Sequence, residues 1–508
     1  MRTIVNFCLS WCSNIMILLL VWTHTMSAQK VMGAMKEKFS VRIVADSLSD
    51  PWEIAYGPDN YLWVTESRNY LVSRINPADG KKDVVLDLNA KRLFPRYDKI
   101  GKEQGGKPWP QGGLMGMALH PELLNGKPYV YLMYIYRFEG VDSAGKGCKD
   151  NFGGCRFLGR VVRYDYNKQA KQLLNPVTLC DSIPQSNDHN GGRLTLAPVK
   201  GKLYLFCTVG DMGAGQFGNA GQPNRAQDIN SYEGKILRFN TEPDADTMGY
   251  DKWVPNDNPY NSKAQNAVWS LGHRNPQGLA CALINGNDLL YSTEHGPFSD
   301  DEVNIIDKGA NYGHPLISGY ADGNYDGLAA SVSSNEQLPG RWNTTYPFIK
   351  SEKNNAKKIG TAYRDPIASL YPNANTFLTR LYSERLKGDE KQDWPSEAPS
   401  SIAVYSSDAI PGWKHSLLIP TLKGNKLIRY TLDSSGAKIT GDTLCYFNSH
   451  CRYRDIAISP DGKKIYLSVD NNATSSNPAK ENPEKLHYPG TIIEFIYEGD
   501  KKVPRTER

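Results

Sequence analysis

The segment RDIAISPDGKKIYLS, residues 454–468, joins two short apolar strands through a Pro-Asp-Gly turn. The same succession of strand, turn and aromatic-rich strand occupies residues 51–66. Four further copies have first strands that begin at Gly113, Gly192, Gln277 and Ser400. Repeated strand–turn–strand units build rings of small sheets in which each unit packs its apolar faces against the next. Six copies therefore predict an all-β fold, a six-bladed β-propeller.

Long insertions interrupt the repeat around residues 81–112, 216–265 and 320–395. Loops of this length are usually functional or disordered, and we expect them on the face that carries the active site. The composition supports a folded, strand-rich chain, since 45 Gly and 31 Pro supply turns and 29 Tyr favour strands. Two β-sandwiches are the alternative fold, but they leave the recurrent turn units unexplained.

The first 28 residues have the pattern of an export signal. Arg2 precedes an apolar run at residues 15–22, and Ser27-Ala28 offers small residues for cleavage. This run is much shorter than the roughly 20 residues that cross a bilayer, and no later stretch approaches that length. We therefore expect an exported protein, periplasmic or secreted, with a single mature domain at residues 29–508 and no membrane span.

Net charge and cysteine content bear on nucleic-acid binding, disulfides and zinc sites. The net charge of +5 falls to +4 without the signal, and the only basic cluster lies at the C-terminus. Nucleic-acid binding is therefore not expected. Cys148 and Cys155 flank one short loop and Cys445 and Cys451 flank another, so both pairs are candidates for disulfides in an oxidising compartment. Neither pair has a second Cys/His pair at the spacing that zinc needs.

Polar clusters stand where the predicted blades begin. In the run NDHNGGR, residues 187–193, His189 has the chemistry of a general base near neutral pH. Asp211 follows the next strand and is placed to orient that histidine. The alternative is that the polar run only caps a loop.

Other clusters supply donors, oxygen ligands and cations. The run LGHRNPQG, residues 271–278, offers donors suited to carboxylates and carbonyls. In EHGPFSDDE, residues 294–302, a Gly-Pro turn offers backbone carbonyls that suit Ca²⁺, with acids nearby. Lys423 and the run RYRD at residues 452–455 add cations that would bind a polyanion. Taken singly, LGHRNPQG is equally compatible with a polar loop, whereas EHGPFSDDE alone favours a solvated acidic turn and the cations alone favour ordinary surface charge.

Together, DHNGGR, LGHRNPQG, EHGPFSDDE and RYRD resemble the soluble quinoprotein glucose dehydrogenases and the related glucose/sorbosone and aldose sugar dehydrogenases. The motifs occur in the same order, and the resemblance spans about residues 40–497. It implies a propeller that oxidises an aldose at its anomeric carbon to the lactone. The implied cofactors are pyrroloquinoline quinone (PQQ) and Ca²⁺, and an external acceptor takes the electrons.

The resemblance also implies roles for individual residues. His189 matches the base that takes the proton of the anomeric hydroxyl, Asp211 matches its carboxylate partner, and Arg274 matches a residue that polarises the quinone carbonyl. The positions that match cofactor contacts are Arg274, Asn275, Gln277, Ser396, Lys423, Arg452 and Arg454. Gly296 and Pro297 match the carbonyl ligands of calcium. The positions that match sugar contacts are Gln111, Asp188 and Gln216.

The chain departs from the family pattern in places. His295 stands where the best-known glucose-oxidising members have Gln. Residues 391–393 replace an aromatic-containing run beside the sugar pocket, so the expected substrate is an aldose and not glucose in particular. Residues 318–322 resemble a region that binds additional calcium at a homodimer contact, with Tyr320 and Asp322 as the candidates.

Two other functions compete with sugar oxidation. A calcium-dependent propeller lactonase would need several side-chain carboxylates and Asn on its metal. A non-catalytic sugar-binding propeller would be expected to lose the base or the cofactor-binding cations. The residues that such a protein would lose are all present, namely His189, Arg274, Lys423, Arg452 and Arg454.

Overall fold

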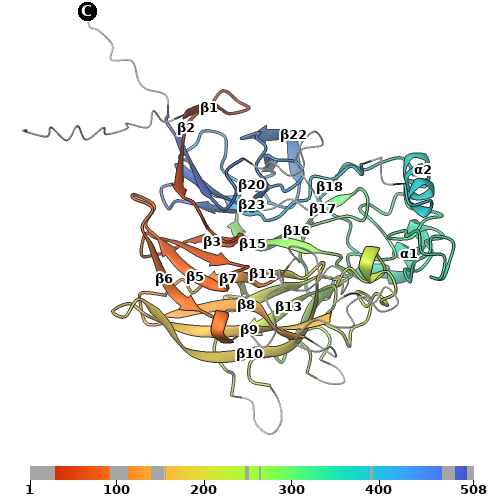
Figure 1. The fold of residues 1–508 in the computed structure, drawn as a ribbon, viewed down its shortest axis with the longest axis horizontal. Coiled ribbons are helices and arrows are strands. Elements are labelled where there is room, and N and C mark those ends of the chain that lie inside the picture. Colours follow the sequence, from red (N-terminus) through yellow and green to blue (C-terminus); the bar gives the residue numbers. More distant parts are fainter. Residues whose placement is uncertain are drawn as a thin grey trace, which may run out of the picture.

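The computed structural model describes residues 29–91, 112–138, 154, 156–245, 251–261, 265–389, 393–471 and 487–499. Within these residues, six small antiparallel sheets form a ring (Figure 1). The predicted all-β, six-bladed propeller is therefore confirmed. The export signal predicted at residues 1–28 lies outside the described residues. No helix in the described part of the chain is long and apolar enough to cross a membrane.

Five blades are meanders of four strands each. The first two consist of β3 (Pro51–Tyr56), β4 (Leu62–Glu66), β5 (Leu71–Ile75), β6 (Lys82–Asp87), β7 (Leu114–Leu119), β8 (Tyr129–Phe138), β9 (Arg156–Asn167) and β10 (Gln172–Ser186). The next three consist of β11 (Gly191–Val199), β12 (Lys202–Val209), β13 (Lys235–Asn240), β14 (Val268–Leu271), β15 (Pro276–Ile284), β16 (Asn287–Glu294), β17 (Asp301–Ile305), β18 (Ala368–Leu370), β19 (Ala403–Tyr405), β20 (Ser416–Pro420), β21 (Leu427–Leu432) and β22 (Ile439–Tyr446).

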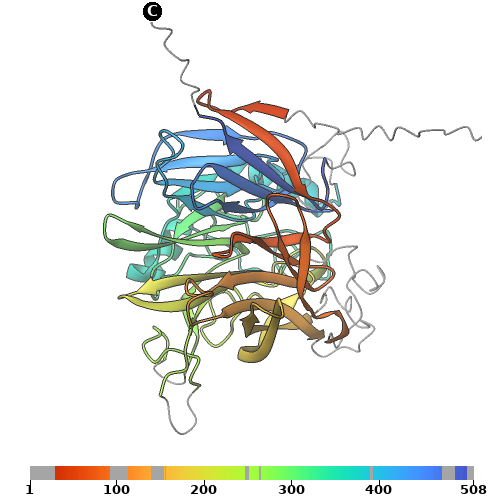
Figure 2. The ribbon, with the colours of Figure 1, turned by 90° about the vertical axis from the view of Figure 1, so that its left-hand side faces the viewer.

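The sixth blade joins the two ends of the described chain. It contains β23 (Tyr453–Ile458), β24 (Lys464–Val469) and β25 (Ile492–Tyr497), and β2 (Lys38–Ala45) and β1 (Gln29–Met32) add to its outer edge. Figures 1 and 2 show these red N-terminal strands beside the blue C-terminal blade. The side chains of Arg42 and Glu494 pair across the β2–β25 seam at 2.5 Å. Pairing of the ends closes the ring and covers an edge that would otherwise be exposed.

The first strand of every blade is one of the six predicted repeat strands: β3, β7, β11, β15, β19 and β23. Neighbouring blades cover both faces of many strands, so buried positions follow one another along a strand and include polar residues. The segment LWVTE of β4 and the segment KILRFN of β13 are buried at every position. The repeats therefore show as short apolar runs and not as a clean alternation of polar and apolar residues.

One buried arginine connects the blades at their centre. The side chain of Arg193 pairs with Glu53 at 2.5 Å and with Asp455 at 3.1 Å. Its other nitrogens donate to the backbone carbonyls of Gln277 and Ser400 at 2.9 and 3.1 Å. Arg193 therefore ties together residues of the first, third, fourth, fifth and sixth blades.

The third long insertion contains packed helices where a loop was expected. Helix α1 (Glu352–Ile359) follows β17, and α2 (Asn375–Leu386) follows β18. Both lie on the same side of the molecule in Figure 1. Residues of the insertion form a separate apolar core around Tyr325, Trp342 and Tyr382. Of the two expectations for long loops, functional or disordered, disorder does not hold for this part of residues 320–395, because these side chains bury one another.

The cysteines do not follow the predicted pairing where they are described. Cys445 and Cys451 are both free thiols in this structure. Cys445 lies near the charges of Lys426 and Glu397, whereas Cys451 lies beside Ser449. The two thiols therefore face different neighbours and the proposed disulfide is absent. Cys148 and Cys155 lie outside the described residues.

Candidate active site

His189 and Asp211 form a buried pair at one end of the third blade. His189 lies two residues before β11, and Asp211 lies two residues after β12. Nδ1 of the histidine lies 2.7 Å from Oδ1 of the carboxylate. The backbone is tight here, because a Cβ at Gly210 would lie 1.9 Å from the carbonyl oxygen of His189. The two residues predicted as base and partner thus lie within hydrogen-bond distance of each other.

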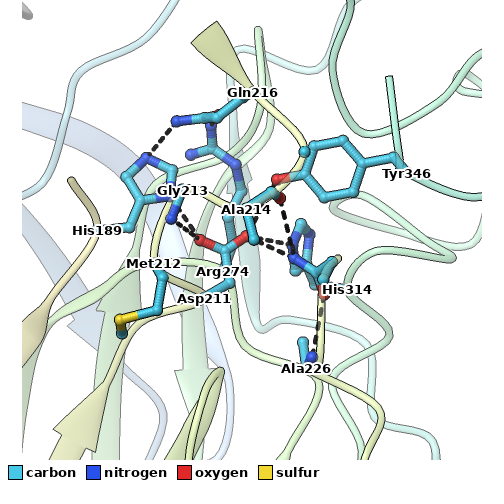
Figure 3. Close-up of polar contacts among 12 residues, drawn as sticks. His189, Asp211, Met212, Gly213, Ala214, Gln216, Ala226, Arg274, His314 and Tyr346 are labelled. Carbon is cyan, nitrogen blue, oxygen red and sulfur yellow. Dashed lines mark hydrogen bonds and ion pairs between the residues drawn. The ribbon is translucent and has the colours of Figure 1, made fainter. Parts of the chain in front are cut away.

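Gln216 and Arg274 fix the tautomer of His189 (Figure 3). Nη2 of Arg274 donates to Oε1 of Gln216 at 2.5 Å, so the amide nitrogen of Gln216 faces the histidine. That nitrogen lies 2.9 Å from Nε2 of His189. An amide nitrogen only donates and an ionised carboxylate only accepts. The ring proton of His189 therefore sits on Nδ1, and Nε2 carries the lone pair.

Asp211 is held in its ionised form. Burial alone would raise the pKa of this carboxyl, but His189 and His314 hold it well below its ordinary value. Its Oδ1 also accepts the backbone N–H of Gly213 at 2.9 Å. A buried, ionised carboxylate on Nδ1 stabilises the imidazolium that forms when Nε2 takes up a proton. The pair therefore has the geometry and charge of a general base and its orienting partner.

Two of the three predicted sugar-contacting residues lie beside the base. Gln216 contacts His189 as described, and its Nε2 also lies 3.3 Å from Oδ2 of Asp188. Both side chains are buried. Gln111 lies outside the described residues. A carboxylate, an amide and a basic nitrogen thus stand together, as recognition of a polyhydroxylated molecule needs.

A second set of predicted residues continues from Arg274 toward the axis. Nε2 of Gln277 donates to Oδ1 of Asn275 at 3.0 Å. Oε1 of Gln277 accepts from Nη1 of Arg454 at 3.1 Å. Oδ1 of Asn275 also lies 3.3 Å from the backbone nitrogen of Gly191, two residues after His189. The predicted residues Arg274, Asn275, Gln277 and Arg454 therefore line one connected region next to the base.

Asp470 binds both arginines of the RYRD run. Nε of Arg452 lies 2.9 Å from its Oδ2, and Arg454 reaches both of its oxygens at 2.9 and 2.6 Å. Burial alone would raise the pKa of the Asp470 carboxyl, but Arg454 and Arg452 hold it below its ordinary value. Two buried guanidinium groups thus share the carboxylate of Asp470, and Asp50 lies close enough to interact with both of them.

Lys423 and Ser396 lie on neighbouring loops of the fifth blade. The backbone nitrogen of Lys423 donates to the carbonyl of Glu397 at 3.1 Å. Its Nζ pairs with Asp393 at 2.9 Å and lies 4.8 Å from the ring centroid of Trp394. The hydroxyl of Ser396 donates to Oδ2 of Asp301 at 2.7 Å. The nearby residues Lys391 and Gln392 lie outside the described residues.

Asp301 links Ser396 to the predicted calcium turn. Its Oδ1 accepts the backbone N–H of Gly296 at 3.0 Å, and its Oδ2 accepts that of Glu397 at 2.8 Å. The turn that contains Gly296 and Pro297 is therefore fixed beside Ser396, with a carboxylate next to it. Burial raises the pKa of Asp301, and hydrogen bonds from Ser396 and the backbone oppose that shift.

Side-chain metal clusters are not found in the described part of the chain, where no group of three or more His, Cys, Asp or Glu side chains is placed to hold a metal ion. The predicted ligands Gly296 and Pro297 are backbone carbonyls, so this result does not bear on them. Asp322 accepts the backbone N–H of Asn324 at 3.0 Å. Additional calcium near Tyr320 and Asp322, and the homodimer contact, stay predictions.

His295 is a neutral imidazole between the two sets of residues. Burial lowers its pKa well below the ordinary value, and His189, Arg274 and Arg454 add to the shift. Its Nε2 lies 3.0 Å from the carbonyl oxygen of Pro399, which can only accept. Nε2 therefore carries the proton. Its own carbonyl accepts from Nη1 of Arg274 at 3.1 Å.

Sequence reasoning missed several residues of the site. Oε2 of Glu294 accepts the backbone N–H of Arg274 at 2.8 Å. Asp470 holds the arginines, and His314, Tyr346 and Asn224 contact Asp211. A positional signal existed for the two acids, because Glu294 ends the second strand of its blade and Asp470 directly follows the second strand of its own, much as Asp211 follows β12. His314 and Tyr346 lie in the long connection between β17 and β18, which has no repeat to place them.

Comparison with known proteins gives consistent matches over most of the chain. The sequence model of the glucose/sorbosone dehydrogenase family matches residues 48–353 and 389–476. Quinoprotein glucose dehydrogenase B of Acinetobacter calcoaceticus is 33% identical over 488 residues, which cover 91% of this chain and 92% of the relative. Aldose sugar dehydrogenase of Escherichia coli strain K12 is 26% identical over 449 residues, which cover 87% and 93%.

Solved structures match the fold. The PQQ-bound form of aldose sugar dehydrogenase from Streptomyces coelicolor has a TM-score of 0.56 and 24% identity, covering 91% of this chain and 98% of that one. The apo-form of the soluble aldose sugar dehydrogenase from Escherichia coli has a TM-score of 0.58 and 22% identity, covering 90% and 99%. At this level of identity, the similarity supports the architecture and not the details of the site.

Proposed function

This chain belongs to the glucose/sorbosone dehydrogenase family, and we propose that it oxidises an aldose at its anomeric carbon to the lactone with PQQ and Ca²⁺. The observation that carries the proposal is the buried His189–Asp211 pair, whose basic nitrogen faces Gln216 next to a cluster of cations. Membership of this family makes the chain an oxidoreductase. The named relatives are a quinoprotein glucose dehydrogenase and an aldose sugar dehydrogenase, which supports the choice of cofactor and substrate class.

The donor set of the site fits an anionic quinone. Nε of Arg274 is buried and, in the described part of the chain, has no hydrogen-bond partner. That free donor is suited to a quinone oxygen, with Asn275 and Gln277 beside it. The cations that would hold carboxylates are Lys423, Arg452 and Arg454. Ser396 adds a hydroxyl group. The carbonyls of Gly296 and Pro297 are the hard oxygens that suit Ca²⁺.

The residues of this chain have separate tasks in the proposed reaction. Bound PQQ with Ca²⁺ as a Lewis acid supplies the hydride acceptor. Nε2 of His189 takes the proton of the anomeric hydroxyl, and Asp211 holds the ring and stabilises its positive charge. Gln216 and Asp188 bind hydroxyl groups of the sugar and keep the reacting hydroxyl next to Nε2. Arg274 aligns Gln216 and presents its remaining donor to the cofactor.

The proposal extends to location and partners. A leader at residues 1–28 would export the protein to the periplasm or outside the cell, where an external acceptor takes the electrons. The lactonase alternative has less support, since the described residues contain no cluster of acidic side chains that could hold its metal. The non-catalytic alternative has less support because the chain keeps the candidate base His189, its partner Asp211 within hydrogen-bond distance, and the candidate cations.

Reconstitution tests the proposal. The mature protein is titrated with PQQ in the presence and absence of Ca²⁺, and binding is followed by the absorbance of the quinone. Dye reduction is then measured across a panel of aldoses, with a lactone hydrolysis assay run in parallel. We expect calcium-dependent PQQ binding and dye reduction with at least one aldose. Absence of quinone uptake together with lactone hydrolysis would favour the lactonase.

A further inference from the structure

Asp211 is shared by two histidines (Figure 3). His189 contacts Oδ1 at 2.7 Å, and Nε2 of His314 contacts Oδ2 at 2.8 Å from the opposite side. Oδ2 also accepts from the hydroxyl of Tyr346 at 3.1 Å and from Nδ2 of Asn224 at 2.9 Å. A carboxylate that only had to orient His189 would need the contact at Oδ1 but not the three contacts at Oδ2. We propose that His314, with Tyr346, is a positioning residue that sets the orientation and basicity of His189 through Asp211.

His314 is itself firmly held and carries its proton on the nitrogen that faces Asp211. Its backbone nitrogen donates to Gly272 at 3.0 Å, and its carbonyl accepts from Gln227 at 2.7 Å. Its ring lies edge-on against that of Tyr346. Because an ionised carboxylate only accepts, the 2.8 Å contact with Oδ2 of Asp211 requires a proton on Nε2 of His314. The amide nitrogen of Asn224, 3.3 Å from Nε2, donates to the same carboxylate oxygen at 2.9 Å.

Burial favours the neutral form of His314. Burial lowers the pKa of His314, and Asp211 opposes this shift. The charged groups that face His314 are Asp211, Arg274 and Glu294. Glu294 raises the pKa of His314 as Asp211 does, whereas Arg274 lowers it. Burial and Asp211 raise the pKa of Tyr346 well above its ordinary value, and Asp188 adds to that shift. Both groups therefore donate as neutral partners over the pH range in which a histidine base works.

Sharing the carboxylate has a predictable effect on His189. Each donor on Oδ2 draws negative charge away from Oδ1, so Asp211 stabilises the protonated form of His189 less than an unshared carboxylate would. The same donors prevent rotation of the carboxylate away from Nδ1. Removal of His314 should thus make His189 more basic and less well oriented. The connection between β17 and β18, which carries His314 and Tyr346, would in this way contribute to the chemistry of the third blade.

The first test uses the cofactor-free protein with histidine labelled at Cε1 and NMR titration of the His189 ring. In His314→Leu we expect the titration midpoint of His189 to rise relative to wild type, because Oδ2 of Asp211 loses a hydrogen-bond donor. His314→Gln keeps an N–H donor and should restore most of the wild-type midpoint. His120→Leu is the matched control, because it removes another buried histidine from the end of β7. An unchanged midpoint in folded His314→Leu overturns the inference.

The second test uses the loaded enzyme, and this part rests on the proposed function. We expect kcat of His314→Leu to fall roughly ten-fold, as for other groups that orient a catalytic side chain, with KM and PQQ affinity within two-fold of wild type. The acid side of the pH–rate profile should move with the NMR midpoint. If no aldose is oxidised while the NMR shift is present, the proposed function fails and the coupling stands.

Tyr346→Phe keeps the test decisive if His314→Leu does not fold. This change removes one hydroxyl donor from Oδ2 and leaves the ring that packs on His314. The midpoint of His189 should move in the same direction as in His314→Leu, by a smaller amount. If neither Tyr346→Phe nor any folded His314 variant shifts the midpoint, Asp211 does not couple the two sides and the inference is wrong.

Discussion

Asp470 pairs with both Arg452 and Arg454, and all three residues are buried. A buried ion loses its hydration, so removal of a partner leaves a charge that nothing compensates. The two arginines are also the residues that we expect to bind an anionic cofactor. Asp470 therefore compensates the charges of Arg452 and Arg454 in the cofactor-free protein. In the cofactor-bound protein, we expect the same two arginines to bind the anionic cofactor.

The variant Asp470→Asn tests this role in the cofactor-free protein. We expect the free energy of unfolding to fall by about 3–5 kcal/mol at pH 7, measured by urea denaturation. Asp83→Asn removes half of the exposed pair of Lys171 and Asp83 and should leave the free energy of unfolding nearly unchanged. Because the folded-state pKa of Asp470 is lowered, its stabilisation is present above the ordinary Asp pKa of about 3.9 and is lost below it. A difference that persists unchanged at pH 3 contradicts this role.

At the residue scale, the sequence predicted the types of side chain more readily than their partners. His189, Asp211 and Arg274 were recognisable because each follows or precedes an apolar strand of a repeat. Their contacts with Gln216 and with one another depend on loops that are far apart in the chain. No pattern in a single sequence indicates that His314, 103 residues after Asp211, shares its carboxylate.

At the element scale, the second strands of the blades place acids at the same end of the ring. Glu66 ends β4, Asp211 follows β12, Glu294 ends β16 and Asp470 follows β24. All four are buried and accept hydrogen bonds from the loops at that end. This shared position in the repeat could have predicted Glu294 and Asp470. The helices α1 and α2 lack such a signal, because their stability comes from the packing of the insertion on itself.

Lys235 is the first residue of β13 and binds the loop that follows Asn224. Its Nζ donates to the carbonyls of Arg225, Ala226 and Glu233 at 3.0, 3.0 and 2.6 Å, and the residue is fully buried. Burial lowers its pKa to about 7, and Glu233 opposes the shift. In the unfolded chain the ordinary pKa of lysine is about 10.4. The folded state therefore binds fewer protons than the unfolded state between these two values.

The pH dependence of stability follows from that difference. Stability rises with pH where the unfolded state binds more protons. From pH 7 to 10, wild type should gain up to about 1.4 kcal/mol per pH unit relative to Lys235→Met. The measurement is urea denaturation of both proteins at several pH values. Lys202→Met removes an exposed lysine from β12, and its free energy of unfolding should change with pH as that of wild type does. The same pH dependence in Lys235→Met and wild type would contradict the account.

At the scale of the whole molecule, Arg193 joins five blades through ion pairs and backbone carbonyls. The sequence indicated the six blades, since each first strand repeats. It did not indicate the closure by β1 and β2, because the pairing of β2 with β25 joins residues more than 400 positions apart. In the sequence, Arg193 is only the last residue of the NDHNGGR run. Its ion pairs with Glu53 and Asp455 explain why an arginine stands there.

Replacement of Arg193 should weaken the whole ring. Arg193→Met leaves Glu53 and Asp455 buried without their cation, so we expect a loss of about 3–5 kcal/mol in the free energy of unfolding. Arg193→Lys should recover only part of it, since an ammonium cannot reach the same fork of acceptors. Arg364→Met, which breaks an exposed pair with Asp307, should cost less than about 1 kcal/mol. Equal losses in the two methionine variants would show that Arg193 does not hold the blades together.

The central claim is that His189 is the base of a quinone-dependent sugar oxidation, and anaerobic single-turnover kinetics test it most directly. Wild type and His189→Gln are loaded with PQQ and Ca²⁺ and mixed with an aldose carrying hydrogen or deuterium at C1. We expect both proteins to bind the quinone, and wild type to reduce it more slowly with the deuterated sugar. In His189→Gln the rate should fall by roughly 10²–10⁴-fold. Reduction at the wild-type rate in His189→Gln would contradict the assignment of the base.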